Sequence, residues 1–111
     1  MNIEATIIEY LNKNGIKAVA DIPATRPDEF VTVERTGGSF GSVVLDRPTV
    51  AVQAWSTTRY KASELMTEVD TLMRNLVSIS GVSKCSRNSL YNYPDESGHP
   101  RYQAVYDIVT Y

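Results

Sequence analysis

The sequence has 111 residues, of which 42% are hydrophobic and 22% are charged, and its formal net charge is −2. This length predicts one domain with one core, and the composition excludes the hydrophobicity-poor signature of a disordered chain. The basic residues stand singly along the chain, so the sequence lacks the basic run that is typical of proteins that bind nucleic acid or anionic lipid.

Cysteine usage and hydropathy indicate where the chain is made. One cysteine cannot form an internal disulfide. Met1 leads into a mixed polar segment without the apolar core of a signal peptide, and no apolar run approaches the roughly 20 residues that cross a bilayer. We therefore expect synthesis in the cytosol and no insertion into a membrane.

The first predicted element is a helix. Asn2 is a typical N-cap residue and Gly15 is a typical residue just beyond a helix C-terminus. The apolar residues between them recur at helical spacing: Ile3, Ile7, Ile8 and Leu11. A short strand is predicted over residues 16–21, followed by an irregular, proline-containing connection over residues 22–30.

Two alternating segments then predict strands. The first covers residues 30–36, and the glycine-rich stretch at residues 37–47 is predicted to be a loop. The second strand covers residues 48–55, and Pro48, which has no N–H to donate, suits its first position.

The longest pattern in the chain predicts a second helix. Thr57 or Thr58 can cap it, and Gly81 follows its end after about twenty residues. Its apolar stripe comprises Ala62, Leu65, Met66, Val69, Leu72, Met73 and Leu76. Because this stripe is too wide for a coiled-coil seam, we expect it to pack on a sheet that contains Val50 and Val52.

Two further strands, over residues 82–91 and 101–111, complete the order α-β-β-β-α-β-β. This order predicts a single α+β domain over residues 1–111, with two helices on an antiparallel or mixed sheet of about four to five strands. The core residues that we predict are Val50, Val52, Trp55, Leu65, Val69, Leu72 and Leu76.

The sequence offers no conventional catalytic or metal-binding pattern. His99 has no second histidine or cysteine pair with which to bind zinc, and Cys85 lacks a base at any recognisable spacing. The glycine-rich segment 36–42 lacks the Gly-Lys-Ser/Thr ending of a phosphate-binding loop. Carboxylates are spread over different elements, so we expect no cofactor, no metal and no enzymatic activity.

Arginine and tyrosine are concentrated in the predicted loops, in "PATRPDEF", "ERTGGSFG", "LDRP" and "LYNYPDESGHPRY". Both residue types are favoured in the cores of protein interfaces. This composition indicates an interaction protein. Ordinary loops, with tyrosines half-buried in a sheet, remain an equally open explanation.

Two long segments and one short motif carry a resemblance to a known family. "RPDEFVTVERTGG", residues 26–38, and "DRPTVAVQAWSTTRYKASELMTEVDTLM", residues 46–73, resemble the tail terminator proteins of long-tailed bacteriophages and prophages, also called tail completion or tail-to-head joining proteins. The features that match are Arg26-Pro27, Phe30-Val31, Glu34 to Gly38, Asp46 to Pro48, Gln53, Trp55, Ala62 and Pro100-Arg101-Tyr102. Ser63 and Thr67 stand where the family frequently has alanine.

The resemblance implies a structural virion protein rather than an enzyme. Such a protein forms a ring, usually of six copies, on the last ring of the tail tube, ends tube polymerisation and presents a face to the head connector. The implied partners are further copies of this chain, the tail tube protein and the head connector or neck proteins, with no specific nucleic acid and no membrane. The implied location is the tail or neck of a virion made in a bacterial cytoplasm.

The candidate interface residues are Arg26, Glu34, Arg35, Gly37, Gly38, Phe40, Arg47 and Arg101. We further expect the loop at residues 37–45 to be mobile in a free subunit and ordered on a neighbour, with a long hairpin packed on its own domain as the alternative. Two other functions remain open. One is another neck or minor capsid connector protein, and the other is a small ligand-binding or enzymatic α+β domain.

Overall fold

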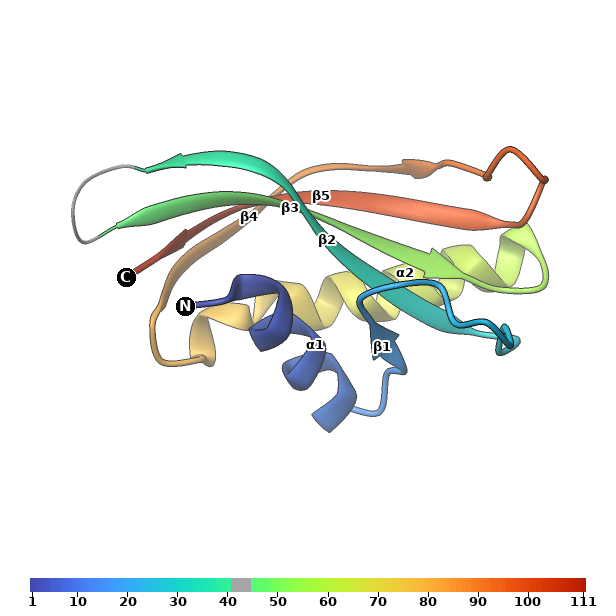
Figure 1. The fold of residues 1–111 in the computed structure, drawn as a ribbon, viewed down its shortest axis with the longest axis horizontal. Helices are drawn as coiled ribbons and strands as arrows, with labels where there is room; N and C mark the ends of the chain where they lie inside the picture. The colour runs from blue at the N-terminus through green and yellow to red at the C-terminus, as the bar shows by residue number, and fades with distance from the viewer. Residues whose placement is uncertain (41–44) are drawn as a thin grey trace.

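The structure is a computed structural model that describes residues 1–40 and 45–111. The described chain forms a single α+β fold in the expected order α-β-β-β-α-β-β, which confirms the predicted fold class (Figure 1). Its elements are α1 (Ile3–Lys13), β1 (Ala18–Val19), β2 (Phe30–Phe40), β3 (Asp46–Trp55), α2 (Arg59–Arg74), the 3₁₀ helix η1 (Leu76–Ser78), β4 (Val82–Asn92) and β5 (Arg101–Thr110).

The sheet is mixed, with strand order β1-β2-β3-β5-β4. β1 pairs with β2 in parallel, and the other neighbouring strands are antiparallel. Both helices lie on the same side of the sheet, as Figure 1 shows. Within the described residues no helix covers the opposite side, which we call the outer face.

The first helix forms as predicted. The side chain of Asn2 accepts a hydrogen bond from the backbone N–H of Ala5 at 3.1 Å, so it caps the helix N-terminus. Gly15 has φ +85°, a left-handed conformation that glycine adopts at low cost after a helix. Ile3, Ile7 and Leu11 are buried and attach α1 to the sheet.

The second helix begins as expected but ends earlier. Thr58 caps it by accepting from the N–H of Lys61 at 3.1 Å, and α2 stops at Arg74 rather than continuing toward Gly81. The apolar stripe nevertheless continues, because η1 follows and places Leu76 fully inside the core. Leu72, predicted as core, is only half-buried at the margin of the cluster.

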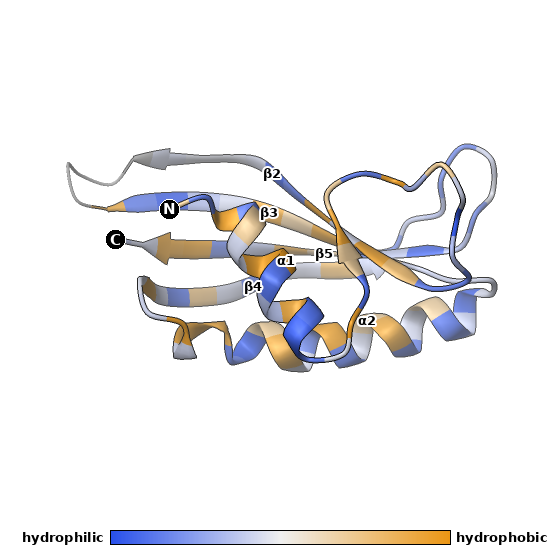
Figure 2. Cartoon of the chain, turned by 60° about the horizontal axis from the view of Figure 1, so that its bottom comes forward, coloured by the Kyte–Doolittle hydropathy of each residue, from blue (hydrophilic) through white to orange (hydrophobic). Residues whose placement is uncertain are grey.

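The core lies between the helices and the sheet. β2, β3 and β5 direct alternate apolar side chains at the helices, as their pleat requires. The sheet residues in this cluster include Val31, Val33, Val50, Val52, Ala104, Tyr106 and Ile108, and α2 contributes Leu65, Met66, Val69 and Met73. Figure 2 shows hydrophobic and hydrophilic residues alternating along α2. The expected packing of α2 on Val50 and Val52 is therefore confirmed.

The prediction that strand β2 ends at residue 36 is wrong. β2 continues to Phe40, and Gly37 and Gly38 pair with Thr49 and Pro48 of β3 instead of forming a loop. A register shift between Arg35 and Gly37 accommodates one extra residue, as in a β-bulge. A Cβ at Gly38 would lie 2.2 Å from the carbonyl oxygen of Arg47, so the close approach of the two strands requires glycine there. The remainder of the predicted loop, residues 41–44, lies outside the described residues.

The start of β3 also differs from the prediction. β3 begins at Asp46, which makes Pro48 its third residue rather than its first. Pro48 lies in a strand with neighbours on both sides, where proline is uncommon. Between Asp46 and Thr49, however, the register with β5 contains no paired residue, so the missing N–H interrupts no ladder there.

The first strand is shorter than residues 16–21. β1 contains only Ala18 and Val19, which pair with Val31 and Thr32. The side chain of Asn12 accepts from the N–H of Ala18 at 3.0 Å and donates to its carbonyl oxygen at 3.1 Å. The side chain of Asn12 thus satisfies the backbone N–H and carbonyl oxygen of Ala18, so these groups need no further strand beside β1.

Candidate functional site

Aromatic and arginine side chains gather at one end of the outer face. Phe30 of β2 and Trp55 of β3 are directly paired across the strands, and their rings are stacked with centroids 5.7 Å apart and planes 5° apart. The guanidinium carbon of Arg26 lies 4.9 Å from the Trp55 ring centroid and 5.3 Å from that of Phe30. Trp55 is therefore buried on the outer face, opposite Val50 and Val52, and not in the cluster that packs against the helices.

A second arginine covers the same indole. The guanidinium carbon of Arg101 lies 4.7 Å from the Trp55 ring centroid and 4.4 Å from that of Tyr93. Its Nε donates a hydrogen bond to the carbonyl oxygen of Tyr93 at 2.6 Å, which fixes the plane of the group. Tyr91 meets Tyr93 edge to face, with ring centroids 5.7 Å apart. We call Arg26, Phe30, Trp55, Tyr93 and Arg101 the arginine–aromatic cluster.

A ladder of side-chain hydrogen bonds crosses the outer face beside this cluster. The indole N–H of Trp55 donates to the hydroxyl of Thr32 at 3.0 Å, and that hydroxyl donates to Oε1 of Gln53 at 2.7 Å. Nε2 of Gln53 donates to Oε1 of Gln103 at 2.7 Å, and Nε2 of Gln103 donates to the hydroxyl of Tyr91. Every strand from β2 to β4 contributes to the ladder, so it holds the outer face in one arrangement.

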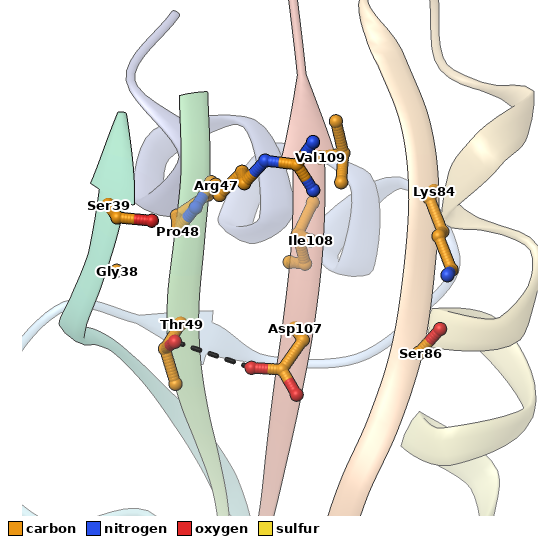
Figure 3. Close-up of a pocket in the computed structure, with 10 residues that line it drawn as sticks. All are labelled: Gly38, Ser39, Arg47, Pro48, Thr49, Lys84, Ser86, Asp107, Ile108 and Val109. Atoms are coloured by element: carbon orange, nitrogen blue, oxygen red, sulfur yellow. Dashed lines mark hydrogen bonds between the residues drawn. The ribbon is translucent and has the colours of Figure 1, made fainter. Parts of the chain in front are cut away.

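The opposite end of the outer face contains a shallow polar groove of about 420 Å³. Figure 3 shows Arg47 and Thr49 of β3 beside Asp107 of β5, with Lys84 of β4 farther across. Asp107 accepts hydrogen bonds from Thr49 at 3.4 Å and from Asn88 at 3.2 Å. This groove combines two basic side chains with one carboxylate that is already hydrogen-bonded.

The predicted interface residues fall into two groups in space. Arg26 and Arg101, which are far apart in the sequence, both contact the Trp55 ring. The others lie along the β2–β3 hairpin: Glu34, Arg35, Gly37, Gly38, Phe40 and Arg47. Phe40 pairs with Asp46 through the backbone.

Arg35 is engaged within its own subunit. Its Nη1 and Nη2 donate to the two carboxylate oxygens of Asp46 at 2.7 and 3.0 Å, a bidentate ion pair. These hydrogen bonds lower the pKa of Asp46 and raise that of Arg35. Arg35 therefore stabilises the β2–β3 hairpin through its ion pair with Asp46.

Tyr91, Tyr93 and Gln103 were missed as site residues. The tyrosines belong to the segment "LYNYPDESGHPRY", which indicates an interaction surface without assigning a contact, and no pattern distinguishes Gln103 from the other residues of the last strand. Alternation along β4 and β5 could have placed Tyr91 and Gln103 on one face, because they are direct cross-strand partners. The stacking of Tyr93 on Arg101 had no sequence signal.

A buried carboxylate lies on the helix side of the sheet. Asp70 accepts hydrogen bonds from the Tyr106 hydroxyl at 2.7 Å, from Arg87 at 3.0 Å and from Arg74 at 3.1 Å. Burial, reinforced by the Asp70 carboxylate, raises the pKa of Tyr106. The same two causes raise the pKa of Cys85 to about 11, so its thiol is protonated at neutral pH.

Among residues 1–40 and 45–111, no group of three or more histidine, cysteine, aspartate or glutamate side chains could hold a metal ion. His99 pairs with Asp95 in the turn before β5, with Nδ1 2.9 Å from the carboxylate. Neither α1 nor α2, the helices of the described chain, has the length and apolar character needed to cross a membrane.

No protein-family model matches the chain, and no curated protein sequence matches it either.

Proposed function

We propose that this protein is a structural subunit of a phage tail, which forms a ring at the head-proximal end of the tail tube, ends tube polymerisation and joins the tail to the head. In this proposal it is not an enzyme and uses no cofactor. Its partners are further copies of the chain, the tail tube protein and the head connector, and it is located in the tail or neck of the virion.

The convergence of the motif residues carries this proposal. The sequence features that resemble tail terminators come from three separate segments, and one residue or more from each lies in the arginine–aromatic cluster or its ladder: Arg26 and Phe30, Gln53 and Trp55, and Arg101. Arginine, tryptophan and tyrosine are the residue types most enriched in interface hot spots. The motif residues that converge on this surface support a binding role, whereas others, such as Val31 and Ala62, lie in the core.

The irregular edge strands of the sheet oppose strand pairing between subunits, which favours contacts through the faces of the sheet. β4, at one edge, has register shifts between Val82 and Lys84 and between Arg87 and Ser89. β1 covers only two residues of β2, and the exposed remainder of that edge carries the bulge before Gly37. Bulges and charged residues on edge strands oppose edge-to-edge pairing. The outer face, by contrast, is uncovered by any element of the described chain.

The proposal is tested in the phage or prophage that encodes the chain, by inactivating its gene. We expect tails of abnormal length that fail to join heads, and restoration of normal virions by the wild-type gene in trans. Electron microscopy of wild-type tails, with the chain labelled, should place it as a ring at the head-proximal end. Normal tails and infectious virions from the inactivated strain contradict the proposal. A ring elsewhere in the neck would identify another connector protein instead.

A further inference from the structure

We propose that the two arginines of the arginine–aromatic cluster dock onto Glu64 and Glu68 of α2 in a second copy of this chain, so that the outer face of each subunit meets the helix layer of the next. This contact rests on the proposed ring. It specifies which two surfaces meet and which charges hold them together.

The arginine pair is electrostatically incomplete within the subunit. Arg26 and Arg101 both lie within 5 Å of the centroid of the Trp55 ring, yet neither forms an ion pair in the part of the chain that the structure describes. Each guanidinium is thus a charge without a carboxylate partner in the described chain, and carboxylates from another molecule can supply that partner. Stacking also orders the side chains in advance, which lowers the entropy that binding must remove.

The surroundings of the pair favour a carboxylate over an extended chain of phosphates. A cleft of about 600 Å³ adjoins Trp55 and Arg101, and its lining includes Asp21 and Glu34. These acidic side chains repel a polyanion that runs along the outer face. Nε of Arg101 is bound to the carbonyl oxygen of Tyr93, so Nη1 and Nη2 are the groups through which Arg101 can bind a carboxylate.

The solvent side of α2 offers such carboxylates. Glu64 and Glu68 are exposed, lie one turn apart and form no ion pair among the described residues. Tyr60, one turn before Glu64, is 72% exposed, the largest exposed fraction among the exposed large hydrophobic side chains of the described chain. The Tyr60 ring is an aromatic contact of the kind that interfaces favour, and the two carboxylates beside it can pair with arginines. We call these three residues the α2 patch.

The two surfaces also lie at matching positions in the molecule. α2 begins four residues after Trp55, so the α2 patch and the arginine–aromatic cluster occupy the same end of the long axis, on opposite layers (Figure 1). Around a rotation axis parallel to that long axis, equivalent ends of neighbouring copies lie level. The outer face of one copy then meets the α2 patch of the next, a head-to-tail contact that can close into a ring.

The test uses two charge-reversed proteins and sedimentation velocity over a concentration series. Variant A carries Arg26→Glu and Arg101→Glu, and variant B carries Glu64→Arg and Glu68→Arg. Each alone places like charges on both sides of the contact, so each should self-associate roughly tenfold or more weakly than wild type. An equimolar mixture restores opposite charges at every contact of an alternating ring and should recover the wild-type assembly.

A matched control replaces variant B with Glu9→Arg, which reverses an exposed charge on α1 away from both surfaces. This control keeps both wild-type surfaces, so it should assemble alone, but variant A should stay largely outside its assemblies, because the reversed cluster of variant A meets the unchanged carboxylates of the α2 patch. Recovery in the A and B mixture would show that each variant is folded. Its weak self-association when alone would then come from the reversed charges and not from misfolding.

Three outcomes would overturn the proposed contact. Wild-type rings that persist in variant A, or an A and B mixture that stays dissociated, show that other surfaces hold the ring, while the proposed tail function stands. Wild-type protein that remains monomeric at the highest attainable concentration also overturns this contact. The proposed function is then judged separately, by the tail phenotype of the inactivated gene.

Discussion

On the helix-covered face of the sheet, burial comes from apolar side chains such as Val52 and Ile108, which pack against Met66 and Val69 of α2. On the outer face, Trp55 is 2% exposed, Thr32 4% and Gln103 9%, although no helix of the described chain covers them. There, Arg26 and Arg101 cover the Trp55 ring, and side-chain hydrogen bonds satisfy the polar groups of Thr32 and Gln103. The same strands thus support two kinds of surface, one held by apolar area and one by directional contacts.

This difference separates stability from recognition. Apolar area is non-directional, so the helix-covered face sets most of the folding free energy. Directional contacts fix the positions of charged groups, which is what a binding surface requires. We therefore expect substitutions on the helix-covered face to change mainly stability, and those on the outer face to change mainly association.

The largest expected effect is on the helix-covered face. Met66 is fully buried between α2 and the sheet, so Met66→Ala should destabilise the protein by about 2–5 kcal/mol through lost apolar contact and a cavity. Leu72→Ala should cost less, because Leu72 is only half-buried. Urea unfolding of both variants measures the difference. Equal losses would show that Leu72 belongs to the core after all.

The next effect tests the correction to β2. Gly38 has φ +115° and lies against the backbone of Arg47, so Gly38→Ala should cost about 2 kcal/mol or more through strain and steric conflict. Gly37→Ala is the matched control, since a Cβ at Gly37 meets nothing within 4 Å. Thermal unfolding compares the two variants. Similar melting temperatures would contradict the close approach of β2 and β3.

The outer face should respond differently. Replacing Arg26 and Arg101 by glutamine removes contacts worth about 0.5–2 kcal/mol each in cation–π attraction, so the variant should remain folded. Its self-association should weaken far more than its stability. Lys13→Gln, at an exposed site on α1, controls for loss of positive charge. Unfolding curves and sedimentation together measure both quantities, and a parallel loss of both would remove the distinction between the faces.

The smallest effect concerns the hairpin base and depends on pH. Arg35 lowers the pKa of Asp46 in the folded protein, so this pair stabilises the fold above the unfolded pKa of about 4 and loses that contribution as pH falls through the lower folded value. Because the pair is partly exposed, we expect about 1 kcal/mol or less.

Asp46→Asn should therefore be less stable than wild type at pH 7, and the difference should shrink toward zero in acid. Asp28→Asn, at an exposed site without an ion pair among the described residues, provides the control. Chemical unfolding across a pH series measures both differences. A difference for Asp46→Asn that is constant with pH would show that the ion pair does not contribute.

The sequence by itself determined the order of the elements, the caps at Asn2 and Thr58, and the apolar stripe that binds α2 to the sheet. These features depend on residues close together in the chain, whose spacing follows the helix and strand periods. It also identified Arg26 and Arg101 as interface candidates. It did not predict that both contact Trp55, because about 75 residues separate them and the position of Arg101 beside Trp55 depends on how β3 and β5 pair.

Only the tertiary structure decided where β2 ends and what buries Trp55 on its side of the sheet. Gly37 and Gly38 look like loop residues in isolation, but the close approach of β3 makes glycine the residue that a strand requires at position 38. Trp55 alternates away from Val50 and Val52, yet its burial depends on Arg26 and Arg101 arriving from other segments. Local periodicity fixes which residues share a face, while long-range pairing fixes what that face meets.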